Sequence, residues 1–103
     1  MKFFIILLIS LSPVLYADDS LAPQTIKKVS TGWANEGVYI ELSQTNNADG
    51  CQASRVKFDA AHPFLKEILS IALSAFHAKS NVQIRVSGCT GIDFNGIAIE
   101  ISE

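Results

Sequence analysis

The chain has little of what a catalytic or metal site needs. Its 103 residues include two histidines and two cysteines, and their spacing matches no zinc-binding pattern. The glycines stand singly, so no glycine-rich loop is present that could hold a phosphate. Ser74 and His77 lie three residues apart, but a serine nucleophile also needs a carboxylate that orients its base, and none is near them. The sequence therefore predicts a protein that is not an enzyme and that binds no metal and no cofactor.

Basic residues are also few. The chain has 8 Lys and Arg against 10 Asp and Glu, which gives a net charge of −2, and Lys27-Lys28 is the one adjacent basic pair. Nucleic-acid binding depends on a clustered basic surface. The composition therefore argues against a nucleic-acid partner.

The longest apolar run lies at the N-terminus and is too short to span a membrane. Phe3–Leu11 follows the positively charged start Met1-Lys2, and Ser12-Pro13 ends it. A bilayer span takes about 20 residues, whereas a short apolar run that leads to a small residue, here Ala17, is typical of a secretory signal peptide. We predict a signal peptide over 1–17, an exported protein that is periplasmic or secreted, and no membrane span in the mature chain.

The remaining chain predicts a flexible leader over 18–24, which has no periodicity, and a single small domain over 25–103. Both cysteines, Cys51 and Cys89, lie in this domain. An oxidising compartment favours one disulfide between them, and closing that loop stabilises the fold by about 4 kcal/mol in the chain-entropy model. Two free thiols or a bridge between two chains are the alternatives.

Alternation of apolar and polar residues predicts five strands and one helix. The strands are expected at Thr25–Ser30, Val38–Leu42, Ser54–Phe58, Val82–Val86 and Ile97–Ile101, the helix at Pro63–Ala78, and polar loops at Ser43–Gly50 and Ser87–Gly91. This order, βββαββ, predicts an α+β domain with mostly antiparallel strands: a small OB-like five-stranded sheet or partly open barrel packed on one helix.

The predicted helix is apolar over roughly two-thirds of its circumference at 100° per residue. A helix on the surface of a small monomer needs only one apolar face, so we expect the second flank to pack against another copy of the chain. The residues assigned to this homo-oligomer interface are Leu65, Leu69, Ala72 and Phe76.

Trp33 lies in a turn bounded by Gly32 and Gly37, beside Asn35 and Glu36. An aromatic ring next to amide and carboxylate groups suits a sugar, which has an apolar face and a rim of hydroxyl groups. We therefore assign Trp33, Asn35 and Glu36 to a candidate glycan-binding site. The alternative is that Trp33 covers one end of a small barrel.

The stretches FLKEILSIALSAFHAKSNVQIRVSGC and GIAIEIS resemble the C-terminal half of the B subunits of AB5 bacterial toxins, of the cholera-toxin and subtilase-cytotoxin types. The chain also looks like small exported Gram-negative proteins of unknown function, with a GCxx-type loop, here Ser87-Gly88-Cys89-Thr90. The resemblance implies an OB-like fold, a ring of subunits with the helices facing its centre, and glycan binding on the exposed barrel surface.

Two functions remain open at this point. The first is an exported, non-enzymatic binding module that recognises a glycan and forms a homo-oligomer, like the toxin B subunits. The second is a periplasmic inhibitor or partner-binding protein that presents the disulfide-anchored loop SGCTG, because a rigid loop binds with little ordering cost.

Overall fold

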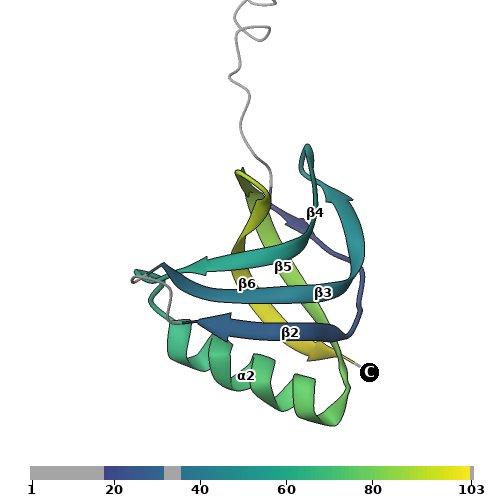
Figure 1. The fold of residues 1–103 in the computed structure, drawn as a ribbon, viewed down its shortest axis with the longest axis vertical. Coiled ribbons are helices and arrows are strands. Elements are labelled where there is room, and N and C mark those ends of the chain that lie inside the picture. Colours follow the sequence, from purple (N-terminus) through teal and green to yellow (C-terminus); the bar gives the residue numbers. More distant parts are fainter. Residues whose placement is uncertain (1–17, 32–35, 103) are drawn as a thin grey trace, which may run out of the picture.

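Seven elements of secondary structure lie in residues 18–31 and 36–102, the part of the chain that the computed structural model describes (Figure 1). They are β1 (Asp19–Ser20), β2 (Ile26–Thr31), β3 (Gly37–Ala48), β4 (Cys51–Asp59), α2 (Leu65–Ala78), β5 (Asn81–Thr90) and β6 (Asp93–Ser102). Trp33 and Asn35, two of the three predicted glycan-binding residues, lie outside the described residues.

The strands form one sheet in the order β1-β5-β6-β4-β3-β2. All neighbours are antiparallel except β4 and β6, which run parallel where Val56 is opposite Phe94 and Lys57 is opposite Asn95. The predicted α+β class with mostly antiparallel strands is confirmed. The predicted count of five strands is wrong, because the described residues form six.

The sixth strand comes from the segment that the sequence predicts to be a flexible leader. Asp19 and Ser20 pair with β5, the Leu21 N–H donates to the Ile84 carbonyl at 2.9 Å, and Gln24 pairs with Val82. Leu21 and Gln24 are each only 3% exposed. Residues 18–24 therefore belong to the fold, and they run directly into β2, at the other end of the strand order.

A reciprocal pair of buried amides fixes this segment against β3. The Gln24 side-chain amide donates to Asn46 Oδ1 at 2.8 Å, and the Asn46 amide donates back to Gln24 Oε1 at 3.3 Å. Gln24 Oε1 also accepts the Gln44 N–H at 3.1 Å. Since a buried amide without a partner is costly, this pairing holds residues 18–24 in one register on the sheet.

Both hairpins are longer than the sequence predicts. The predicted loop at 43–50 is strand up to Ala48, and the turn is limited to Asp49 and Gly50, both at positive φ, 51° and 78°; Asp-Gly is a preferred pair for such a turn. The predicted loop at 87–91 is likewise strand up to Thr90. Polar strand ends pair through their backbone groups, which apolar alternation does not reveal.

The core lies between the inner face of the sheet and α2. The alternating residues Val38, Ile40 and Leu42 are at most 2% exposed, as the sequence predicts, and α2 contributes Ile68, Ala72 and Ala75. The helix lies across one end of the sheet, and the turns β3–β4 and β5–β6 lie at the other (Figure 1). Among the described residues no helix is long and apolar enough to cross a membrane.

The helix begins later than predicted. Pro63 and Phe64 form a turn, and the helical residues start at Leu65. The Phe64 N–H donates to His62 Nδ1 at 3.0 Å, and the other ring nitrogen of His62 lies 2.9 Å from the Ile97 carbonyl oxygen. His62 therefore satisfies a backbone N–H at the helix start and ties that start to β6.

We expect Leu21→Ala to lower the free energy of unfolding by about 2–4 kcal/mol, because it leaves a cavity in the core. Urea unfolding followed by circular dichroism measures the loss. Ala22→Ser is the matched control, since Ala22 is the exposed neighbour of Leu21, and a change there should stay within about 0.5 kcal/mol. Equal stabilities for Leu21→Ala and the wild type would show that residues 18–24 do not pack as described.

Candidate functional site

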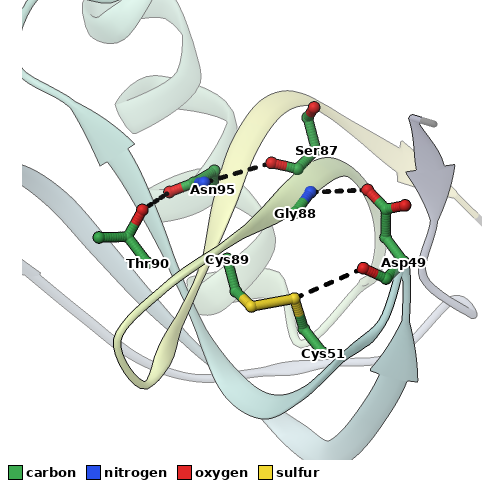
Figure 2. The surroundings of a disulfide bond; sticks show 7 residues. All are labelled: Asp49, Cys51, Ser87, Gly88, Cys89, Thr90 and Asn95. Atoms are coloured by element: carbon green, nitrogen blue, oxygen red, sulfur yellow. Dashed lines mark hydrogen bonds between the residues drawn. A yellow bond between two sulfur atoms is a disulfide. The ribbon is translucent and has the colours of Figure 1, made fainter. Parts of the chain in front are cut away.

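The two cysteines form the disulfide that the sequence predicts. Cys51 is the first residue of β4 and Cys89 the last but one of β5, with a Cα–Cα distance of 6.1 Å and a sequence separation of 38 (Figure 2). The bridge therefore joins the start of β4, in the β3–β4 hairpin, to the end of β5, in the β5–β6 hairpin. A disulfide of this kind is compatible with export to an oxidising compartment.

A short polar contact lies beside the disulfide. The Asp49 carboxylate accepts the Gly88 N–H at 2.7 Å, and the Asp49 carbonyl oxygen lies 3.6 Å from Cys51 Sγ (Figure 2). Asp49 belongs to the turn between β3 and β4, whereas Gly88 lies in β5. The two hairpins are therefore joined at this end by a hydrogen bond as well as by a covalent bond.

Further hydrogen bonds brace the end of the β5–β6 hairpin itself. The Asn95 side chain accepts a hydrogen bond from Thr90 Oγ1 at 3.0 Å and donates one to the Ser87 carbonyl at 3.2 Å (Figure 2). Asp93, which is paired with Thr90 across the turn, is 8% exposed. Its carboxylate accepts two hydrogen bonds from the Arg55 guanidinium, at 2.6 and 3.3 Å. Each strand of the hairpin is thus held close to its tip.

The tip consists of two residues, Gly91 and Ile92, because Thr90 and Asp93 are paired across it. Gly91 has φ 64°, and glycine is preferred at the first position of a tight hairpin turn that needs this conformation. The Ile92 side chain is 75% exposed, the highest value among the large apolar residues that are described. A braced hairpin therefore presents one isolated apolar side chain to solvent.

Sequence reasoning missed Ile92. The prediction placed the tip of the loop at Ser87–Gly91 and treated Ile92 as the approach to the last strand. The sequence Gly91-Ile92-Asp93 could have indicated this turn, because glycine and aspartate are frequent turn residues. An apolar residue inside such a turn cannot reach the core.

A second polar network lies on the outer face of β3 and β4 and ends at the base of this tip. The Tyr39 hydroxyl donates to the Glu36 carboxylate, and the Arg55 guanidinium lies 4.6 Å from the centroid of the Tyr39 ring. The hydrogen bond to Glu36 raises the pKa of Tyr39, and burial and the charge of Glu36 raise it further. Arg55 thus joins Tyr39 to Asp93, next to Ile92.

Of the predicted glycan-binding residues, the structure describes only Glu36. It is exposed, and its carboxylate is engaged by Tyr39. The Tyr39 ring is 8% exposed, so it presents little surface on which a sugar could stack. A glycan site that includes Trp33 and Asn35 stays a prediction.

The four residues assigned to the oligomer interface have different environments. Leu65 and Leu69 are half-buried against the core, Ala72 is fully buried within the single chain, and Phe76 is 39% exposed. Leu73, which was not assigned, is also 39% exposed. An interface on α2 would therefore use Leu73 and Phe76 rather than Ala72, and its existence stays a prediction.

The described residues contain no group of three or more His, Cys, Asp or Glu placed to hold a metal ion. A comparison with models of protein families finds no match, and neither the curated proteins nor the solved structures give a significant match. The candidate site is therefore argued from its own geometry, and we define it as the hairpin tip, residues Thr90–Asp93, with the disulfide that braces it.

Replacing both cysteines by serine should lower the free energy of unfolding by about 4 kcal/mol, because the open chain regains the entropy of a loop of this length. Urea unfolding of the double variant, compared with the oxidised wild type, measures the loss. Reduction of the wild type should have the same effect. An unchanged midpoint in both experiments would contradict a structural role for the bond.

The hydrogen bond between Glu36 and Tyr39 can be tested by alkaline titration. The difference in tyrosinate absorbance between wild type and Tyr39→Phe reports Tyr39 alone, and we expect its pKa above the ordinary 10.0, with Glu36→Gln lowering it. Because the neutral phenol is favoured in the folded state, this contribution to stability is complete below pH 10 and is lost as the pH rises through the raised pKa. Glu41→Gln, on the same strand, should leave the pKa of Tyr39 nearly unchanged.

Proposed function

We propose that this chain is an exported, non-enzymatic binding module with an OB-like barrel, and that it binds a protein partner through the hairpin tip. The exposed Ile92 on its braced turn is the observation on which the proposal rests. This choice favours the partner-binding protein over the glycan-binding module, because an exposed apolar side chain on a braced turn suits an apolar protein pocket.

The topology supports the OB-like assignment. The five long strands lie in the order β2-β3-β4-β6-β5, and α2 follows the third of them in the sequence. An OB-fold is a five-stranded, partly open Greek-key barrel, and here residues 18–24 connect the β2 end of the order to β5. On this assignment β1 and β2 are the two halves of one bent strand, which pairs with β5 through β1 and with β3 through β2.

The energetics of the tip suit a protein partner. Burying an isoleucine side chain is worth about 1.5–3 kcal/mol, which corresponds to roughly 10- to 100-fold in affinity. The tip is already held by the disulfide, by Asn95 and by Asp93, so little conformational entropy remains to be lost on binding. The partner should therefore offer an apolar pocket that admits one branched side chain.

Photo-crosslinking in cells tests this proposal. An amino acid with a short aliphatic diazirine side chain, similar in size to isoleucine, placed at position 92 should give a defined covalent adduct with a partner protein, because the side chain at this position enters the partner's pocket. The matched control position is 101, since Ile101 is also exposed, at 45%, but lies on the last strand. Position 101 should not give this adduct.

Substitution then separates the tip from the rest of the surface. Ile92→Asp should reduce capture of the crosslinked partner by at least 10-fold, while Ile101→Asp should reduce it little. Equal capture by both variants, or the same adducts from positions 92 and 101, would rule out the tip as the contact.

A further inference from the structure

Two residues of β5 direct their backbone hydrogen bonds away from β6. Val82 exchanges both of its bonds with Gln24, at 3.1 and 2.8 Å, and the Ile84 carbonyl accepts the Leu21 N–H at 2.9 Å. The N–H and C=O of one strand residue point to the same side of the strand, so neither residue has a backbone group left for β6. The pairs that Val82 and Ile84 form with β6 are therefore of the non-hydrogen-bonded kind.

The partners of these two residues on β6 must then direct their own backbone groups away from β5. They are Ile101, opposite Val82, and Ile99, opposite Ile84. On its second side β6 pairs with β4 at its N-terminal end alone, and no described residue bonds to the backbone of Ile99 or Ile101 there. We call this segment, Ile99–Ile101, the β6 edge. It presents backbone donors and acceptors at alternate residues.

A side chain confirms the direction in which this edge faces. His62 Nε2 lies 2.9 Å from the Ile97 carbonyl oxygen. Ile97 is two residues before Ile99, so its carbonyl group lies on the same side of β6. A polar group next to the start of α2 thus already bonds to β6 from this side, one step along the strand from the β6 edge.

A mostly apolar groove of about 180 Å³ lies between β6 and the first turns of α2. Ile68 and Ile71 line it from the helix and Ile99 from the strand, together with Phe64, which is 61% exposed. Glu67 contributes a carboxylate, and the described lining contains no lysine or arginine. The groove therefore suits an apolar side chain with a basic residue beside it.

We propose that the β6 edge binds an extended segment of a partner protein, which adds to the sheet as a further strand and places one apolar side chain in the groove. An extended backbone has its N–H and C=O groups at the two-residue repeat of the edge. In this mode of recognition the backbone hydrogen bonds supply affinity, and pockets for alternate side chains supply specificity.

The β6 edge is separate from the hairpin tip. It lies at the end of the sheet that α2 covers, whereas the turn between β5 and β6 lies at the other end (Figure 1). The inference therefore stands independently of the proposed function.

A proline substitution removes one donor from this edge without breaking the β5–β6 ladder. Ile101→Pro deletes an N–H that faces away from β5, and proline is tolerated on an edge strand in this orientation. Ile101→Val is the matched control, because it keeps the N–H and a branched side chain.

Synthetic peptides serve as the probe. Random linear octapeptides displayed on phage are selected on the full chain, and the selected peptides are synthesised and titrated by fluorescence anisotropy. We expect apolar residues at alternate positions, with lysine or arginine between them. Affinity should fall by roughly 5- to 10-fold in Ile101→Pro, the effect of one hydrogen bond, and should change little in Ile101→Val. Glu67→Lys should weaken the same peptides, whereas Leu73→Asp, elsewhere on α2, should not.

Amide hydrogen exchange followed by NMR locates the bound peptide on the wild-type chain. In the free chain the N–H groups of Ile99 and Ile101 should exchange faster than those of Ala98 and Glu100, which face β5. Addition of a selected peptide should slow exchange at Ile99 and Ile101.

The proposal is overturned if no selected peptide slows exchange at Ile99 and Ile101, or if Ile101→Pro and Ile101→Val bind the peptides equally. Slow exchange at these two amides in a free chain that has the mass of a dimer by light scattering would also contradict it, because a second copy would then cover the edge. Circular dichroism checks that Ile101→Pro is folded. Should it not fold, the exchange measurement on the wild type decides alone.

Discussion

The pairing of residues 19–24, here called the N-terminal arm, with β5 is the constraint on which the rest of the fold depends. Without it, β5 and β2 are two unrelated edges, and the core position of Leu21 is empty. An exposed strand edge is a site for unwanted pairing. The buried amides of Gln24 and Asn46 make the arm specific, because each satisfies the other and neither finds an equal partner in a shifted register.

A domain this small needs reinforcement beyond its core, and the two ends of the sheet obtain it differently. At one end α2 covers the core with Ile68, Ala72 and Ala75. At the other end the strands continue as two hairpins with polar side chains, and the disulfide with its neighbouring hydrogen bond holds them together. Polar strand ends that would otherwise fray are thus made rigid, which is the property that a binding surface requires.

The parts of the fold that sequence could predict are those that bury apolar side chains in a regular pattern. The alternation of Val38, Ile40 and Leu42, the position of the helix and the pairing of Cys51 with Cys89 each follow from a local or compartmental rule, and each is confirmed. Strand ends, in contrast, were underestimated, because Asn46 and Asn47 pair with β4 through backbone groups and show no apolar period.

Tertiary contacts explain the remaining errors. Leu21 stands in a stretch without periodicity, and only its packing shows that 18–24 is part of the fold. Gly96 lies just before the predicted last strand and carries no signal in the sequence. A Cβ there would lie 2.7 Å from side-chain atoms of Phe58 and Val56, so the glycine is needed for β6 to approach β4. Ile92 was left in the segment leading to the last strand, because the loop was predicted to end at Gly91, whereas Thr90 and Asp93 are paired and the turn is Gly91-Ile92. The candidate site was thus the least predictable part of the chain.

The distribution of exposed apolar residues separates binding from self-association. Ile92 stands alone on a rigid turn, and a single side chain of this kind buries too little area to hold two copies together but is sufficient to anchor a contact within a larger interface. The contacts of residues 19–24, in contrast, are internal to the fold, because Leu21 lies in the core and Gln24 pairs with Asn46.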